Sequence, residues 1–311
     1  MINDNDNILY KEGDYYEKWN KWVEEIKGFP KSIKLISTDY TNYGYIKDFY
    51  YIGANNVQVY ASLFFNNTIK AREPLVVLYH GLGAVIDSEG FQHIANAWVN
   101  AGYSVLGMDS RLQGGKTIDN ESYEFQEYGL MALNILDEDK YYSKYLFQDA
   151  LKLIDVVNDL AEVRNRPIVV TGGSKGGELS LMAAAKSKRV SLCICDIPSG
   201  CFLKGRVKGA YGNYASVKNL INDRSEIEDK VYKTLSYFDI IHLADEIKVP
   251  VLASVGSLDK VCPPKFFDYA FDRIDSPKEY VEYKDYGHGG YDNIHMPKKI
   301  EFIKKYFNKE I

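Results

Sequence analysis

The chain has 311 residues, of which 46% are hydrophobic and 26% charged, and its formal net charge is −5. These proportions predict a globular protein with a large core, and the charge gives no reason to expect binding to nucleic acid or to an anionic membrane surface. No apolar run approaches the ~20 residues of a membrane span, and residues 1–14 are too polar for a secretory signal. We therefore expect a cytoplasmic protein that folds as one domain over residues 1–311.

Strand-like and helix-like segments alternate along most of the chain. Apolar runs, many of them β-branched, predict strands at 45–52, 57–65, 75–79, 104–108, 168–171, 190–195, 249–255 and 279–283. Segments with helical spacing predict helices at 15–26, 91–101, 141–163, a stretch ending near 185, 265–273 and 297–307. Strands that alternate with helices predict an α/β protein with a mostly parallel central sheet and helices on both faces.

Two parts of the chain depart from this alternation. The chain begins with an N-terminal helical extension of about residues 1–40, and the first two predicted strands read as a hairpin joined through residues 53–56. Residues 198–229 have less regular spacing than the rest. We interpret this block as an insertion in the sheet-forming domain and not as a second domain.

A serine flanked by glycines follows the strand at 168–171. The order strand, Gly172-x-Ser174-x-Gly176, helix is that of the nucleophile elbow of the α/β-hydrolase fold. Glycines fit such a sharp turn because side chains on either side of the serine would collide with neighbouring elements. A glycine-rich turn without a catalytic role, or one that binds a phosphate, has the same local pattern. The other catalytic groups must therefore be present before the turn can be interpreted as a nucleophile elbow.

A serine nucleophile needs a base and an acid, which follow it in this fold in the order Ser, Asp or Glu, His. His288 lies in a glycine-rich loop after the last predicted strand, and Asp259 follows the strand at 249–255. We predict a Ser174–His288–Asp259 triad. Asp285 is a weaker candidate because it lies too close to His288 in sequence. We expect a capping or surface role for His295.

Acyl transfer also needs hydrogen-bond donors for the oxyanion. We expect these donors to be the backbone N–H groups of Lys175 and Leu82, and we expect Gly81, Gly83 and Pro263 to contact the substrate. Three further histidines precede Asp259 in the sequence. We expect His80 to shape the loop after the strand at 75–79, and His93 and His242 to be structural, so none of the three is a candidate base.

The four cysteines, Cys193, Cys195, Cys201 and Cys262, could form disulfides or bind zinc. There is no C-x-x-C pair and no neighbouring histidine, and a cytoplasmic setting disfavours disulfides. We therefore expect buried free thiols, no metal site and no organic cofactor.

Longer motifs make the chain resemble the acetyl xylan esterase / cephalosporin C deacetylase family, the seventh family of carbohydrate esterases. The TLSYFD motif and the DxxCPP-type loop are far more discriminating than the G-x-S-x-G pattern alone. The resembling segments are 79–81, 109–114, 129–142, 171–177, 233–239, 259–264 and 286–288. The resemblance implies an α/β-hydrolase that removes acetyl groups from small O-acetylated sugars and related alcohols. It also implies a doughnut-like hexamer of paired subunits, with the 198–229 insertion contributing to pairing.

Four positions depart from the usual motifs of that family. Lys175 stands where the family usually has glutamine, and Leu82-Gly83 where it usually has Tyr-Asn. Leu112 interrupts the Arg-Gly-Gln-Gly motif, and Gly289 replaces a glutamate that often follows the catalytic histidine. Because the triad positions match, hydrolysis is expected. Two alternatives remain open: a hydrolase of other acyl esters or acyl-peptides, and a non-catalytic assembly protein that keeps the fold.

Overall fold

A computed structural model describes residues 11–68 and 73–307; the polar start at residues 1–10 lies outside this range. The described residues form one nine-stranded sheet in the order β1-β2-β3-β5-β4-β6-β7-β8-β9. The strands are β1 (Ile33–Thr41), β2 (Gly44–Ile52), β3 (Gln58–Asn66), β4 (Leu75–Tyr79), β5 (Ser104–Met108), β6 (Ile168–Gly173), β7 (Val190–Asp196), β8 (Val251–Gly256) and β9 (Lys278–Tyr283). The first three strands are antiparallel to their neighbours, and the remaining pairs are parallel.

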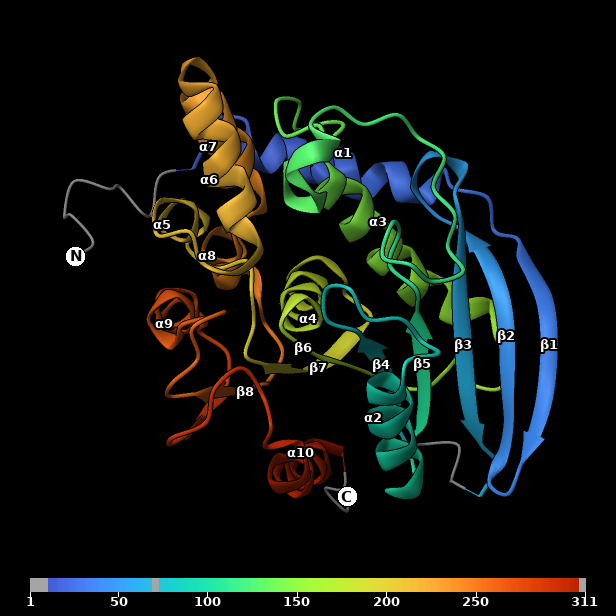
Figure 1. Ribbon diagram of the computed structural model, residues 1–311. Coiled ribbons are helices and arrows are strands. Elements are labelled where there is room, and N and C mark those ends of the chain that lie inside the picture. Colours follow the sequence, from blue (N-terminus) through green and yellow to red (C-terminus); the bar gives the residue numbers. More distant parts are fainter. Residues whose placement is uncertain (1–10, 69–72, 308–311) are drawn as a thin grey trace.

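Helices cover both faces of this sheet, as predicted (Figure 1). They are α1 (Tyr15–Lys27), α2 (Glu89–Asn100), α3 (Tyr142–Val156), α4 (Lys175–Lys186), α5 (Leu203–Lys208), α6 (Ala215–Asp223), α7 (Glu228–Phe238), α8 (Ile240–Leu243), α9 (Pro264–Asp272) and α10 (Asp292–Phe307). Helices α2 and α10 pack on one face, and α1, α3, α4 and α9 pack on the other. None of the helices in the described ranges is both long and apolar enough to cross a membrane.

Strand β4 illustrates why the central strands are continuously apolar. Successive side chains of a strand point to opposite faces. Val77 and Tyr79 pack with the core around α3 and α4, whereas Val76 and Leu78 pack with the core around α2 and α10. A parallel strand with a helix layer on each side therefore needs an apolar residue at every position.

Several predicted segments differ from the observed ones. Strand β1 was not predicted, and it lies in the segment interpreted as a helical extension. Most of its residues are exposed, and its sequence shows no alternation of apolar and polar residues that would mark a strand. The long predicted helix at 141–163 ends as an α-helix at Val156. The block 198–229 is largely helical, because α5 and α6 lie within it, and α7, which was not predicted, follows. Helix α10 begins at Asp292, five residues early, and includes Pro297.

Candidate active site

The nucleophile elbow joins β6 to α4. Ser174 has φ 56° and ψ −115°, a region that residues other than glycine rarely occupy. A Cβ atom on Gly172 would lie 2.3 Å from the carbonyl oxygen of Tyr79, and one on Gly176 would lie 2.0 Å from the same atom. Both distances are far below van der Waals contact, so glycine is required at both positions for the strand and helix to approach each other.

Hydrogen bonds to the backbone hold this strained serine in place. The Ser174 N–H donates to the carbonyl oxygen of Asp196 at 2.9 Å, and the Ser174 carbonyl accepts from the N–H groups of Glu178 and Ser199, each at 3.0 Å. The Ser174 hydroxyl oxygen lies 4.0 Å from the sulfur of Cys262. The side chain is thus presented at the carboxyl edge of the sheet by a fixed backbone.

His288 and Asp259 are brought together by the loops that follow β9 and β8. His288 Nδ1 lies 2.8 Å from Asp259 Oδ2, and the other carboxylate oxygen accepts from the N–H groups of Val261 (2.7 Å) and Cys262 (2.8 Å). Burial opposes ionisation of Asp259, but these hydrogen bonds outweigh it and lower the pKa of the carboxyl. An ionised Asp259 favours the tautomer with the proton on Nδ1, which leaves Nε2 free to accept a proton.

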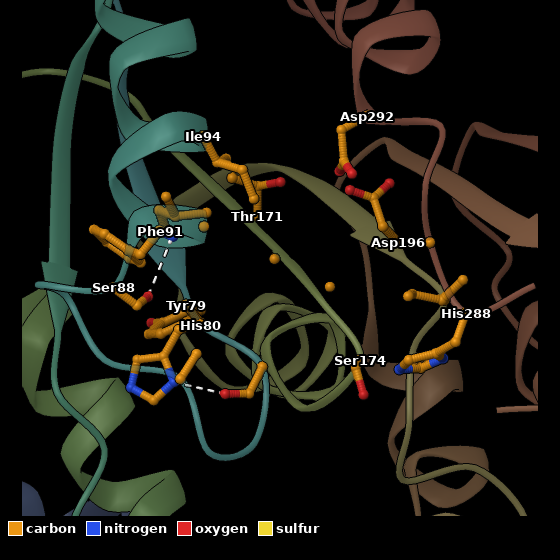
Figure 2. A pocket seen from close by; sticks show the side chains of 18 of the residues that line it. Tyr79, His80, Ser88, Phe91, Ile94, Thr171, Ser174, Asp196, His288 and Asp292 are labelled. Atoms are coloured by element: carbon orange, nitrogen blue, oxygen red, sulfur yellow. Dashed lines mark hydrogen bonds between the residues drawn. The ribbon is translucent and has the colours of Figure 1, made fainter. Parts of the chain in front are cut away.

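A cavity of about 330 Å³ is lined by both Ser174 and His288 (Figure 2). Ser174, His288 and Gly81 line it at one side. The remaining wall is formed by apolar side chains that include Leu78, Phe91 and Ile94, and by the charged side chains of Asp196, Asp292 and Lys299. The volume falls in the range of small-molecule sites, and its mixture of an apolar wall with a few polar groups is typical of them.

The loop after β4 approaches Ser174 through its backbone. A Cβ on Gly81 would lie 3.9 Å from the Ser174 Cβ, so the Gly81 backbone packs against the elbow. The Gly83 N–H donates to Gln113 Oε1 at 2.8 Å and is therefore not available to an oxyanion. The Leu82 side chain packs against the main core. The cavity is not lined by Leu82, Gly83 or Pro263.

The Lys175 side chain does not line the cavity, and its charge is paired inside the protein. Its Nζ contacts both carboxylate oxygens of Glu178 at 2.8 Å, and both side chains are buried. Ser199 donates a further hydrogen bond to Glu178 at 2.5 Å. The departure from glutamine therefore places no charge in the cavity, and Lys175 can contribute to an oxyanion site only through its backbone.

The segment 109–114 holds the loop after β4 in place through a hydrogen bond from Gly83 to Gln113. Arg111 is fully buried between two carboxylates, with Nε 2.7 Å from Asp149 and Nη1 2.9 Å from Asp119. Its carbonyl oxygen accepts from the Tyr142 hydroxyl at 2.9 Å, and that hydroxyl in turn accepts from Gln113 Nε2 at 2.9 Å. Gln113 thereby links a rigid ion-pair network to the Gly83 N–H.

We expect Gln113→Leu to lower kcat/KM by a factor of about 10 to 100, because the loop beside Ser174 loses its anchor and small misplacements at a reacting centre are costly. Gln113→Glu retains an acceptor for the Gly83 N–H and should lose much less. Steady-state kinetics on an activated ester measure both variants. Equal losses in the two would contradict an anchoring role.

His80 lies in the same loop, and both of its ring nitrogens are occupied. Nε2 accepts from the Ser110 N–H at 2.9 Å, so Nδ1 carries the proton that is shared with the Gly81 carbonyl at 2.8 Å. Burial lowers the pKa of His80, which favours this neutral form. These contacts agree with the expectation that His80 shapes the loop.

His295 does not have the expected capping or surface role. It is fully buried in α10, with Nδ1 2.9 Å from the Tyr283 hydroxyl and Nε2 3.2 Å from Asp196 Oδ1. The error arose because the helix was predicted to begin at Pro297, whereas Pro297 lies inside α10, which begins five residues earlier. Proline lacks an N–H and usually marks the start of a helix or a break in it, so its position was misleading. Cys193, Cys195, Cys201 and Cys262 are all buried free thiols, as expected.

Asp196, Lys299 and Arg206 were missed as site neighbours. Asp196 ends β7, a strand neighbouring the elbow strand, so the carboxyl-edge rule could have identified it. Lys299 and Arg206 lie in α10 and α5, where a basic residue in an amphipathic helix gives no signal of burial. Both are at least 97% buried.

Comparisons with known proteins show which family the chain is related to. The acetyl xylan esterase (AXE1) family pattern matches residues 3–306. The chain belongs to the acetyl xylan esterase family. Membership indicates a carboxylic ester hydrolase, and the mostly parallel sheet with its helices is the α/β-hydrolase fold that the elbow predicted.

Two solved structures of this family are similar over nearly the whole chain. An acetyl xylan esterase from Paenibacillus sp. R4 is 30% identical, with a TM-score of 0.87 over 96% of each chain. Acetyl xylan esterase 1 from Thermoanaerobacterium sp. JW/SL YS485 is 28% identical, with a TM-score of 0.83 over 94% of this chain and 95% of that one. The acetyl esterase Axe7A of Xylanibacter ruminicola is 31% identical over 153 residues, which are 49% of this chain and 34% of that relative.

Proposed function

We propose that the protein hydrolyses acetyl esters of small O-acetylated alcohols and sugars through an acetyl-enzyme on Ser174. The observation that carries this proposal is the 2.8 Å contact between His288 and Asp259 beside a cavity that Ser174 also lines. The strained elbow and the family membership support it. The reaction uses no metal or organic cofactor.

In this mechanism His288 Nε2 takes the proton of Ser174 as the serine oxygen attacks the acetyl carbon. The backbone N–H groups of Lys175 and Leu82 would donate to the oxyanion. Collapse of the tetrahedral intermediate breaks the bond to the alcohol oxygen, which receives the proton from His288. A water activated by the same histidine then releases acetate. Asp259 fixes the imidazole tautomer and stabilises its charged form throughout.

The size of the acyl group is tested with nitrophenyl acetate, butyrate and octanoate, together with an aminoacyl anilide. We expect the acetate to give the highest kcat/KM. Acetate release from acetylated xylo-oligosaccharides, cephalosporin C and acetylated metabolites then identifies the alcohol part. A preference for octanoate or for the anilide would instead favour a hydrolase of other acyl esters or of acyl-peptides.

The alternative of a non-catalytic assembly protein is tested by covalent labelling. A fluorophosphonate reacts with an activated serine, so we expect it to label the wild-type protein and to leave Ser174→Ala unlabelled. Absence of labelling in the folded wild-type protein would reject the triad proposal and favour an assembly role.

We also propose a homo-oligomer, a hexamer by resemblance to the family. The apolar residues of the 198–229 insertion are mostly buried in the chain's own core, among them Phe202, Leu203, Val207 and Tyr214, so they are not free to form an interface. Light scattering should give a mass near that of six 35.5 kDa chains, about 213 kDa. A monomer over a wide concentration range would contradict the proposal.

A further inference from the structure

Arg206, in α5, is a buried cation without a carboxylate partner among residues 11–68 and 73–307. Only 2% of its surface is exposed, its Nε has no hydrogen-bond partner, and no carboxylate of the described residues forms an ion pair with it. Its Nη2 donates to the Val261 carbonyl at 2.9 Å and contacts the Cys262 sulfur at 3.5 Å. Arg111, by contrast, is held between two carboxylates.

Such an arrangement is costly for folding. A buried charge is normally paired, because transfer of an ion out of water is unfavourable unless an opposite charge or several hydrogen bonds replace the water. A guanidinium stays protonated, so Arg206 cannot escape this cost by losing a proton. A cost of this kind is often retained where the charge has a function.

The position of Arg206 points to what that function is. Cys262 lies between the guanidinium and the nucleophile: its sulfur is 3.5 Å from Arg206 Nη2 and 4.0 Å from Ser174 Oγ. Arg206 Nη2 is therefore at most about 7.5 Å from the Ser174 oxygen, and the buried, neutral thiol of Cys262 contacts both. At this range a charge in a poorly hydrated site acts strongly on charge that develops nearby.

Other charged groups near Arg206 do not cancel it. Glu178 is already paired with Lys175 at 2.8 Å. The ionised Asp259 also lies nearby, because its Oδ1 accepts from the Cys262 N–H at 2.8 Å. Its Oδ2 faces His288 at 2.8 Å, and this histidine becomes positively charged when the substrate oxygen becomes negative, so Asp259 is then paired. Asp239 accepts from three backbone N–H groups, and burial raises its pKa to about 7, so it is only partly ionised at neutral pH. The Tyr214 ring lies 5.5 Å from the guanidinium and carries no charge.

We propose that the Arg206 guanidinium stabilises, through space, the negative charge that forms on the substrate oxygen when Ser174 attacks. This inference rests on the proposed esterase function and assigns to the 198–229 insertion a part in the reaction. Arg206 does not touch the substrate. Its positive charge acts on the substrate oxygen from a distance, across Cys262. Coulomb's law with an effective dielectric constant of about 20 predicts a contribution to the rate on the order of 10- to 50-fold.

Two substitutions separate charge from packing. Arg206→Gln removes the charge but keeps a donor for the Val261 carbonyl, and we expect kcat for nitrophenyl acetate to fall on the order of 10- to 50-fold with KM changed by less than about threefold. Arg206→Lys keeps the charge and should retain at least about a third of wild-type kcat, given the same Coulomb argument. A structural role alone would not produce a loss confined to kcat that lysine rescues.

A second measurement uses phenylboronic acid, which forms an anionic tetrahedral adduct with an active serine. We expect its inhibition constant to rise in Arg206→Gln in parallel with the loss in kcat, and to stay close to wild type in Arg206→Lys. Arg166 gives a matched control: it is 7% exposed and lies just before the amino end of β6, at the opposite edge of the sheet from Ser174. Arg166→Gln should leave both quantities unchanged.

The proposal is overturned if Arg206→Gln, with a melting curve like that of wild type, keeps kcat within threefold. It is also overturned if lysine and glutamine are equally impaired, since guanidinium geometry and not charge would then matter. These outcomes differ from failure of the proposed function. In that case the wild-type protein itself would show no ester hydrolysis and no fluorophosphonate labelling.

Discussion

Ser174→Ala and His288→Ala are each expected to lower kcat by a factor on the order of 10⁶, as in serine hydrolases whose triad acts as one unit. Asp259→Asn should cost on the order of 10⁴, because an amide at this position favours the imidazole tautomer with its proton on Nε2. All three variants should remain folded. Turnover of nitrophenyl acetate, measured beside circular-dichroism melting curves, tests these values.

His93→Ala is the matched control for His288→Ala, because His93 is exposed on α2 and does not line the cavity. It should keep wild-type turnover. A His295→Ala variant tests whether His295, and not His288, is the catalytic base. If His295→Ala were folded but inactive while His288→Ala remained active, the base would have to be reassigned to the buried histidine of α10.

The residues of the proposed triad could be named from sequence because each of them is marked by a local pattern, and the structure brings His288 and Asp259 to 2.8 Å from each other. Glycines at 172 and 176 are forced by contacts with the Tyr79 carbonyl, and Ser174 lies between them. Asp259 and His288 both follow strands, and the carboxyl ends of parallel strands meet at one edge. The central strands were equally clear, since burial on both faces leaves a continuous apolar run.

Strand β1 shows where local pattern fails. Its sequence, IKLISTDYT, has apolar residues next to one another and six of its nine residues exposed, so no face is marked. The strand exists because its backbone pairs with β2 over most of its length. Pairing of this kind is a tertiary property, and an edge strand can form without an alternating pattern.

The charged neighbours of the site were missed for a related reason. Arg206 and Lys299 look like ordinary basic residues of amphipathic helices, and basic side chains are mostly exposed. What makes each unusual is a contact with a distant segment: Arg206 with Val261 and Cys262, and Lys299 with Asp196. Sequence spacing alone does not reveal which helix face packs over a strand end.

The Lys299–Asp196 pair links α10 to the end of β7, where the Asp196 carbonyl accepts a hydrogen bond from the Ser174 N–H. Lys299 Nζ donates to Asp196 Oδ2, and Ser254 donates to Oδ1 at 2.6 Å. Burial of Asp196 opposes its ionisation, but the charge of Lys299 and the contacts with His295 and Lys299 outweigh this and hold the pKa of the carboxyl well below its usual value. Only 4% of the Lys299 side chain and 12% of the Asp196 side chain are exposed.

Lys299→Met should therefore be strongly destabilising, by about 3–5 kcal/mol, because it leaves a buried carboxylate without its partner. For a chain of this length we expect the Tm to fall on the order of 5–8 °C. Lys305→Met is the matched control on the same helix. Lys305 pairs with Glu279 at the surface, where both side chains are about half exposed. The Tm of Lys305→Met should therefore match that of the wild-type protein.

The same pair predicts how stability depends on pH. Because the Asp196 pKa is lower in the folded than in the unfolded chain, its contribution is fully present at pH values above about 4 and is lost as the pH falls further. Wild-type Tm should therefore decrease below pH 4, and Lys299→Met should lose less Tm over that interval, since the carboxyl has already lost its main partner. Thermal melts of both proteins between pH 3 and 7 measure the difference. Parallel curves for the two proteins, or a Lys299→Met protein as stable as Lys305→Met at pH 7, would show that the buried pair does not stabilise the fold as argued.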